Sequence, residues 1–338
     1  MKSDLAQWGR GLAQAMAALL AGAATLLAAA SCAGVGGRAA EKLTVASPPL
    51  EQAALIYVAA DQGYFARNGL AVAVQGYDSG LTALDALLKG DADIAEAAEY
   101  PVAGLAFRKE PVEVIATNDE FENEYLVARR DRGIAAPAGL KGKRVGVARG
   151  TIAEFYLGRL LELQGMGLQN VSLVDVQPED FVSAFAGGSI DAIVAWQPYV
   201  AQMQKAAPAP VVWPAQSGQA AFGVLVTRAR WLDGHVDTAQ RFLASLKEAQ
   251  DYITAHPEEA RSIVAKQLGD DPAYVAGIWP QHRFALSLDR PLIMALEDEA
   301  AWMIRSGLAT GQELPDFSAY IDARALQAAA PGAVSIVR

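Results

Sequence analysis

The chain has 338 residues, of which 52% are hydrophobic, and it carries a formal charge of -10 at pH 7. This length and composition suffice for a large buried core and about two domains of ordinary size, which argues against an intrinsically disordered chain. The acidic balance argues against nucleic acid or an anionic membrane surface as the partner.

Residues 1–31 are predicted to be a secretory signal peptide that does not belong to the fold. Lys2, Asp4 and Arg10 precede an uninterrupted run of mostly Ala and Leu over residues 11–30. Such a run, ending in small residues, is typical of an export signal. Without this segment the charge of the chain is -11. A transmembrane anchor is the alternative, although the Ala and Gly content makes the run weakly apolar for a span.

The only cysteine, Cys32, follows directly after this segment. Its surroundings resemble the lipobox of bacterial lipoproteins, in which the cysteine is acylated and becomes the mature N-terminus, although Ala29 stands where Leu is usual. Ordinary cleavage near Ala30 or Ala33 is the alternative. A single cysteine excludes an internal disulfide. Residues 32–42, rich in Gly and Ala, are predicted to be a flexible tether.

Strands and helices alternate along the next part of the chain. Short apolar runs predict strands over residues 43–46, 71–75, 92–97, 112–117 and 125–129. Helical spacing of apolar residues predicts helices over residues 51–62 and 101–107, and another that Ser79 opens and Gly90 closes. This alternation predicts a largely parallel sheet covered by helices on both faces.

Residues 140–167 are predicted to form a strand, a tight turn and a helix. The strand covers residues 143–148, Gly150 permits the turn, and Thr151 with Glu154 three residues later is predicted to form a capping box. A helix start in this position offers free N–H groups and the positive end of the helix dipole to a ligand. The glycine spacings of nucleotide-binding loops are missing here, so a nucleotide ligand is not predicted.

The rest of the chain adds more alternation and then a helical tail. Residues 130–138, with Gly and Pro, are predicted to cross into a second domain. Further strands are predicted over residues 171–176, 191–195, 211–212 and 222–227. Further helices are predicted over residues 179–186, after Pro198, and over residues 238–255, 257–268, 272–279 and 291–306. Three of the tail helices begin at or next to a proline, which suits the first helical turn.

Ligands of open parallel sheets bind beyond the carboxyl ends of the strands. The residues that follow the predicted strands are therefore candidate ligand-binding residues: Ser47, Glu51, Ser79, Gly80, Glu99, Tyr100, Asn118, Asp119, Gly150, Thr151, Trp196 and Gln197. They come from both halves of the chain, which predicts a small-molecule cleft between two domains.

Each candidate also has a purely structural interpretation. Gly80 and Gly150 can be turn glycines, and Trp196 can be a half-buried aromatic residue between domains. Neighbouring carboxylates can form a solvated acidic face, which we predict for Glu120, Glu122 and Glu124. Glu99 lies between an apolar strand and an apolar helix, so its burial would demand a cationic or hydrogen-bonding partner.

The sequence shows no catalytic constellation. His235, His256 and His282 all lie in the late helical region, away from the predicted strand ends, and do not cluster as a metal site requires. No Gly-x-Ser-x-Gly elbow occurs, and Cys32 lies at the signal region, so no nucleophile with a neighbouring base is predicted. We therefore predict no metal, no cofactor and no enzymatic activity.

Four segments resemble one family in order and spacing: GYFARNGL from Gly63, SGLTALDALLKGDADIA from Ser79, LKGKRVGVARGT from Leu140 and AFAGGSIDAIVAWQP from Ala184. They are similar to segments of the substrate-binding proteins of nitrate, sulfonate and taurine ABC importers, a group with relatives that bind a thiamine-precursor pyrimidine. The resemblance covers about residues 43–227 as motifs.

The resemblance implies a type II periplasmic-binding-protein fold, which is an α/β fold of two α/β domains with a central cleft and a C-terminal helical region. The domains are expected to comprise residues 43–129 with 223–338, and residues 130–222. A hinge is expected through residues 130–138 and the segment before Phe222. The family's ligand contacts map onto candidates at the predicted strand ends: the loop of residues 47–51, Ser79 with Gly80, Glu99 with Tyr100, Gly150 with Thr151, and the Trp196 loop.

The implied function is an extracytoplasmic receptor that delivers a small organic solute to an ABC permease and its ATPase. The protein is expected to be a monomer in the periplasm or cell envelope, to meet the membrane only through a lipid on Cys32, and to bind no nucleic acid. The alternative is an enzyme on the same fold, similar to pyrimidine synthases or dehydratases. Those synthases carry a cysteine-rich motif and a site histidine, which this chain lacks near its predicted cleft.

The charge of the candidate contacts departs from that of an oxyanion receptor. Arg149 is the only nearby base, whereas Glu51, Glu99 and Asp119 are acids, which disfavours a lone anion such as nitrate. Two ligand classes stay open. One is a sulfonate or taurine-like zwitterion with its acid group at the two helix starts and its amine at Glu99 or Asp119. The other is an amine-bearing or pyrimidine-type heterocycle stacked on an aromatic candidate, Tyr100 or Trp196.

Overall fold

The computed structural model describes residues 40–216 and 218–336. The chain divides into two units, Met1–Ala40 and Glu41–Arg338, and the account below concerns the second. The predicted signal peptide, Cys32 and most of the predicted tether lie outside the described residues. The predicted tether, residues 32–42, is too long. Its last two residues, which begin at Glu41, belong to the first strand.

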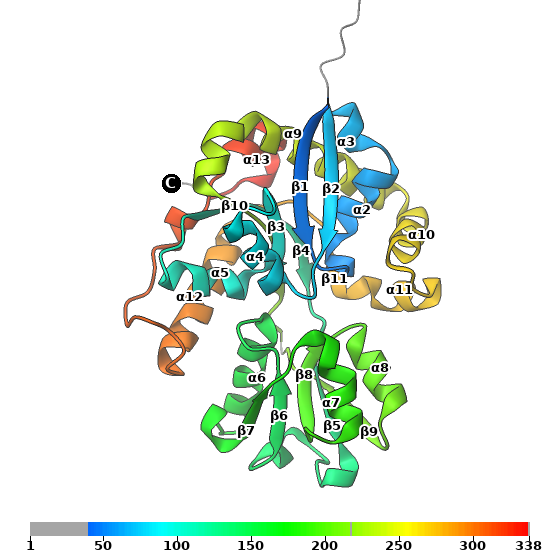
Figure 1. The fold of residues 1–338 in the computed structure, drawn as a ribbon, viewed down its shortest axis with the longest axis vertical. Helices are drawn as coiled ribbons and strands as arrows, with labels where there is room; N and C mark the ends of the chain where they lie inside the picture. The colour runs from blue at the N-terminus through cyan, green and yellow to red at the C-terminus, as the bar shows by residue number, and fades with distance from the viewer. Residues whose placement is uncertain (1–39, 217, 337–338) are drawn as a thin grey trace, which may run out of the picture. The chain divides into compact units, whose positions relative to one another are not determined.

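The first of two sheets has six strands in the order β11-β4-β10-β3-β1-β2 (Figure 1). Its strands are β1 (Glu41–Ser47), β2 (Leu70–Gly76), β3 (Ile94–Ala98), β4 (Val112–Phe121), β10 (Ala221–Arg228) and β11 (His282–Arg283). Strands β2 and β3 run parallel to β1. Strand β10 pairs antiparallel with β3 and β4, and β11 pairs antiparallel with β4.

The second sheet has five strands in the order β7-β6-β8-β5-β9. Its strands are β5 (Glu124–Arg129), β6 (Arg144–Val147), β7 (Ser172–Asp175), β8 (Ala192–Trp196) and β9 (Pro210–Pro214). Strand β6 runs parallel to β7 and β8, whereas β5 pairs antiparallel with β8 and β9.

Helices cover both sheets. Those connected to the first sheet are α2 (Ala54–Asp61), α3 (Tyr64–Arg67), α4 (Gly80–Lys89), α5 (Glu99–Phe107), α9 (Ala229–Ala255), α10 (Pro257–Leu268), α11 (Pro272–Ile278), α12 (Arg290–Arg305) and α13 (Arg324–Ala329). Those connected to the second sheet are α6 (Ile152–Leu163), α7 (Phe181–Gly187) and α8 (Tyr199–Ala206). Within the described residues, no helix is both long enough and apolar enough to cross a membrane.

The α/β fold class is confirmed, and every strand predicted over residues 43–227 is present. The prediction of a largely parallel sheet is wrong, because both sheets are mixed. Three strands are reversed, and two of them, β5 and β10, enter their sheet directly from the other one, whereas the short β11 belongs to the helical tail. A strand that arrives without a helical crossover is free to pair antiparallel.

The chain passes between the sheets at the β4–β5 and β9–β10 connections. Strand β5, predicted to lie in the first domain, therefore pairs in the second sheet. Residues 130–138, predicted to be the crossing and hinge, instead connect β5 to β6 within that sheet. The helical tail adds a further tie, since the backbone N–H of Glu122 donates to the Gln281 carbonyl at 2.9 Å and the Tyr125 hydroxyl donates to Gln281 Oε1 at 2.9 Å.

A buried aromatic cluster joins the two sheets' helices. Trp302 of α12 packs edge-to-face on Phe155 of α6 at 5.6 Å between ring centroids, and Tyr100 of α5 lies 6.0 Å from the same ring. Gly158 of α6 permits this contact, because a Cβ atom there would lie 2.0 Å from Trp302 Cζ2. The three aromatic residues are at most 1% exposed, so α6 and α12 meet through buried aromatic packing.

Candidate functional site

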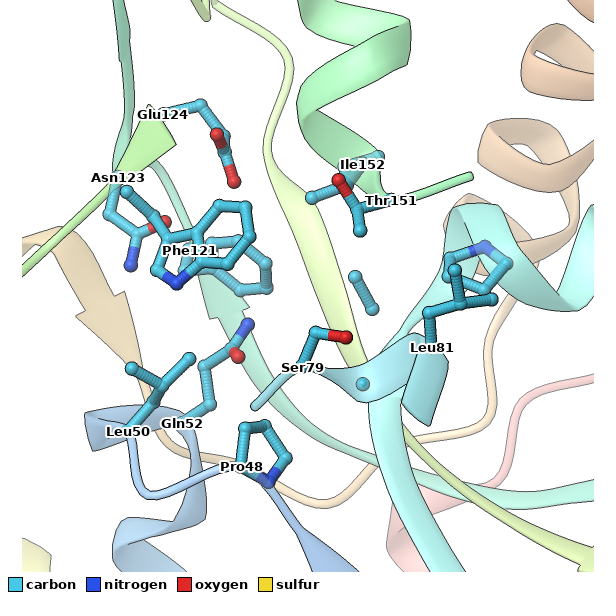
Figure 2. A pocket seen from close by; sticks show the side chains of 14 residues that line it. Pro48, Leu50, Gln52, Ser79, Leu81, Phe121, Asn123, Glu124, Thr151 and Ile152 are labelled. Atoms are coloured by element: carbon cyan, nitrogen blue, oxygen red, sulfur yellow. The ribbon is translucent and has the colours of Figure 1, made fainter. Parts of the chain in front are cut away.

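A cavity of about 40 Å³ lies where the strand ends of both sheets meet. We call it the inner cavity. It is lined by loops and helix starts of the first sheet, by the β4–β5 crossing and by the second sheet: Pro48, Leu50, Gln52, Ser79, Gly80, Leu81, Ala98, Pro101, Phe121, Asn123, Glu124, Thr151, Ile152 and Trp196. Figure 2 shows Asn123 and Glu124 on one side of it and Ser79, Thr151 and Ile152 on the other. Four predicted site residues, Ser79, Gly80, Thr151 and Trp196, are thus brought together.

Helix α4 begins at this cavity with a full capping box. Ser79 Oγ accepts from the Thr82 backbone N–H at 3.3 Å, and Thr82 Oγ1 accepts from the Ser79 N–H at 3.1 Å. Gly80 is needed for close packing, because a Cβ atom there would lie 2.6 Å from Ala97 Cα of the neighbouring strand. The first N–H groups of a helix lack acceptors inside the helix. The start of α4 therefore offers donors and a positive dipole end to the cavity.

Helix α6 begins at the same cavity, but without the predicted capping box. Thr151 occupies the N-cap position, yet its hydroxyl donates to the Ala148 carbonyl at 2.7 Å and caps no N–H group. Glu154 reaches one residue further back than predicted and accepts from the Gly150 N–H at 3.0 Å and from Arg149 Nε at 3.1 Å. These contacts hold the turn and leave the first N–H groups of α6 facing the cavity region.

Glu124 is the ionisable group of the inner cavity, and sequence reasoning missed it. It was predicted to lie on a solvated acidic face, but it is 3% exposed, and its Oε2 atom is buried without a hydrogen-bond partner among the described residues. Burial, and after it the nearby charge of Glu99, raises the pKa of Glu124 to about 8. A buried carboxyl group without a partner destabilises the protein unless a ligand, a proton or water satisfies it.

Two further polar atoms of the wall lack partners. Asn123 Oδ1 and Trp196 Nε1 are buried with no hydrogen bond among the described residues. The Trp196 ring is held edge-to-face by Phe181 at 5.3 Å, so its orientation is fixed. The lining residues include no Lys, Arg or His. The cavity therefore combines a carboxyl group and an amide with two helix starts, which suits a ligand that carries both a donor and an acidic group.

Two of the predicted site residues serve a buried cluster beside the inner cavity. Ser47 Oγ donates to Glu96, and Asn118 Nδ2 donates to Glu96 and, at 3.0 Å, to the Gln52 carbonyl. Burial raises the pKa of Glu96 to about 7, against the lowering effect of the Ser47 and Asn118 hydrogen bonds. Asn118 lies within β4 rather than after it, because pairing with β10 and β11 extends that strand to Phe121.

Glu51 and Asp119 lie in a second buried cluster that does not line the cavity. His282 Nδ1 lies 2.6 Å from Asp119 Oδ2, and both side chains are fully buried. His282 was predicted to lie far from the strand ends, but it forms β11, which pairs with the end of β4. Glu51 is 2% exposed, and burial raises its pKa.

The remaining candidates also lie outside the inner cavity. Glu99 is 1% exposed and accepts from the Phe222 N–H at 3.0 Å. Burial raises the pKa of Glu99 to about 8. The Tyr100 hydroxyl donates to Glu154 at 3.3 Å, and Gln197 Oε1 accepts from the Ala201 N–H inside α8 at 3.2 Å. Gly150 adopts the left-handed conformation that its turn requires, with φ of 77°.

The chain matches a family model described as NMT1/THI5 like over residues 51–260. It is 28% identical over 227 residues to a binding protein of Brucella abortus strain 2308, covering 64% of this chain and 68% of the relative. It is 28% identical over 286 residues to the taurine-binding periplasmic protein of Escherichia coli strain K12, covering 79% of this chain and 88% of that protein.

Solved structures share the fold. The alkanesulfonate-binding protein SsuA of Xanthomonas axonopodis pv. citri, bound to MOPS, matches with a TM-score of 0.73 and 17% identity over 83% of this chain and 98% of that chain. The desulfurization enzyme DSZB matches with a TM-score of 0.65 and 18% identity over 86% of this chain and 99% of that chain. The fold therefore occurs in binding proteins and in an enzyme.

Proposed function

This chain belongs to the NMT1/THI5-like family, and on that premise we propose that it is an extracytoplasmic solute-binding receptor of an ABC importer. The taurine-binding periplasmic relative and the sulfonate-binding structural neighbour support this function. A cavity walled by strand ends of two sheets, with a crossing connection in its wall, supports capture of one small molecule between the sheets.

The ligand we propose is a small amino-sulfonate, a zwitterion of the taurine type. The main support for this ligand class is the carboxyl group of Glu124, which has no hydrogen-bond partner among the described residues and is buried in the same cavity as the starts of α4 and α6. An ammonium group would give Glu124 its partner, and a sulfonate would accept from the free N–H groups at the helix starts. The amine contact thus falls to Glu124 instead of Glu99 or Asp119, which lie outside the cavity. An amine-bearing heterocycle would use the same carboxyl group and stack on Trp196.

We also propose that the protein performs no covalent chemistry on its ligand. The lining residues include no Cys, His or Lys that could act as a nucleophile or general base. The two hydroxyl groups at the helix starts make local contacts, since Ser79 caps α4 and Thr151 donates to a backbone carbonyl. The His–Asp pair of His282 and Asp119 is fully buried and does not line the cavity.

The remaining features of the proposed receptor rest on the sequence and on its resemblance to the family. We propose export by the signal in residues 1–31, lipid attachment at Cys32 as the only membrane contact, and delivery to a permease with its ATPase by a monomeric receptor. The taurine-binding relative is periplasmic, which supports export. Replacing Cys32 by Ser should release the protein from the membrane fraction of its host, and a variant that stays membrane-bound would contradict lipid attachment.

Calorimetry and thermal denaturation of the purified protein test the ligand class with taurine, ethanesulfonate, ethylamine and an aminopyrimidine. Taurine should bind most tightly, and at about 100 times its dissociation constant it should stabilise the fold by about 2.7 kcal/mol. Ethanesulfonate lacks the amine and should bind at least about tenfold more weakly. Equal affinity for both sulfonates would remove the role of Glu124. Tighter binding of the aminopyrimidine would favour the heterocycle.

A further inference from the structure

A second hollow adjoins the inner cavity. It is a groove of about 410 Å³ between α5, α12 and the turn before α6, and we call it the outer groove. Leu81 and Pro101 line both spaces. The volume of the inner cavity is about ten times smaller than that of the outer groove. The shared residues therefore lie between a small space and a large one.

Leu81 contributes the longer side chain of this partition. It is the second residue of α4 and is partly buried, and Figure 2 shows it at the edge of the inner cavity. Its side chain crosses to the turn before α6, where a Cβ atom on Gly150 would lie 3.3 Å from Leu81 Cδ2. The leucine therefore touches elements connected to both sheets, and a shorter side chain would open the partition.

The outer groove suits an anionic group at the end of a chain. Phe107 and Leu308 contribute apolar wall, and Arg108 and Arg149 contribute guanidinium groups. The carboxyl group of Asp175 also lines the groove and accepts from the Arg149 backbone N–H at 3.2 Å. The carboxyl group of Glu154 is already bonded by Arg149 Nε, the Gly150 N–H and the Tyr100 hydroxyl. Among the described residues, Arg149 donates hydrogen bonds only through its Nε atom and its backbone N–H. The side chain of Arg108 makes no hydrogen bond or ion pair with any of these residues. The free ends of both guanidinium groups can donate to a sulfonate or carboxylate.

We propose that Leu81 is a specificity-determining residue that limits the length of the ligand. This inference rests on the proposed function, in which the ammonium group contacts Glu124. With Leu81 in place, the acidic group of a short amino-sulfonate stays at the helix starts of the inner cavity. With a shorter side chain at position 81, a longer amino-sulfonate keeps its ammonium group at Glu124 and extends its sulfonate into the outer groove, to Arg108 and Arg149.

Calorimetry with taurine and aminohexanesulfonate tests the inference on the wild-type protein, Leu81→Ala and a control, Leu88→Ala. Leu88 lies on the same helix, is partly buried and lines neither space. The wild type should prefer taurine, and Leu81→Ala should shift the affinity ratio toward aminohexanesulfonate by about tenfold or more. Leu88→Ala should keep the wild-type ratio. Adding Arg108→Gln to Leu81→Ala should remove most of the gain.

The outcomes separate this inference from the proposed function. If the folded wild type binds neither probe, the amino-sulfonate function fails, and the role of Leu81 fails with it. If the wild type binds taurine and Leu81→Ala keeps the wild-type ratio, the function stands and the role of Leu81 is refuted. A ratio that shifts equally in Leu88→Ala would indicate general loosening of α4 and would also refute it. A gain that survives Arg108→Gln would refute the proposed anion contact.

Discussion

Replacing Glu124 by Gln removes the one ionisable side chain of the inner cavity while nearly preserving its shape. In the free protein the pKa of Glu124 is raised to about 8, first by burial and then by the charge of Glu99. An ammonium ligand needs the ionised form, whereas the free protein favours the protonated form below that pH. Binding must therefore release a proton, and the affinity for taurine should rise with pH.

The size of this effect follows from the ionised fraction. With a pKa of about 8, roughly one tenth of Glu124 is ionised at about pH 7 and roughly one hundredth at about pH 6. The apparent affinity scales with that fraction, so it should rise about tenfold per pH unit up to about pH 8 and level off above it. A glutamine side chain does not titrate, so Glu124→Gln should bind taurine weakly with little pH dependence.

Calorimetry between about pH 6 and pH 8 in buffers of different ionisation enthalpy measures both the affinity and the proton released. Glu122→Gln is a matched control, because Glu122 is an exposed carboxylate on the same crossing segment; it should keep the wild-type pH dependence. Ethanesulfonate, which has no ammonium group, should lack the rise. A wild-type affinity for taurine that stays flat across this range, or falls, would refute the contact between Glu124 and the ligand amine.

Two predictions concern stability. Gly158→Ala should lower the free energy of unfolding by about 1–3 kcal/mol in urea, because the new Cβ atom would lie 2.0 Å from Trp302 Cζ2. Gly277→Ala on α11 should not lower it, since nothing lies within 4 Å of its Cβ position, and equal losses in both variants would contradict the packing argument. The folded-state pKa of Glu99 is raised from 4.5 to about 8 by burial, so the folded protein holds a proton that the unfolded chain releases. Stability should fall between about pH 5 and pH 8, by up to about 1.4 kcal/mol per pH unit for each such carboxyl group. Glu99→Gln should make the fall shallower in urea titrations, and an unchanged slope would count against this assignment.

The sequence predicted those features whose signals are local. Capping residues, turn glycines and apolar runs are read within a few neighbours, so the strands to residue 227 and the starts of α4 and α6 were found. Because carboxyl ends of strands gather at one edge, Ser79 and Thr151 could also be predicted to share a cavity. The hydrogen bonds at the start of α6 could not be predicted in the same way, because the Glu154 side chain accepts from Gly150 and Arg149 instead of closing the predicted capping box.

The wrong predictions concern residues whose position depends on pairing between strands that lie far apart in the sequence. Asp119 was placed after a strand, but pairing with β10 and β11 extends β4 past it and sets it against His282. The crossing was placed near residue 130, since nothing local shows that β5 pairs in the second sheet. Glu124 begins that strand within an acidic stretch, where charge patterning indicates solvent. Glu124 is buried only because the strand ends of both sheets meet around it.

The fixed ring of Trp196 makes the protein an optical reporter of its own occupancy. Its Nε1 atom is buried without a partner among the described residues, and its ring is held edge-to-face by Phe181 in the wall of the inner cavity. A ligand that accepts from this N–H changes the polarity around an indole that Phe181 holds in the cavity wall. Tryptophan fluorescence of the unlabelled protein can therefore follow binding in real time, and Trp196→Phe identifies which part of the signal belongs to the cavity.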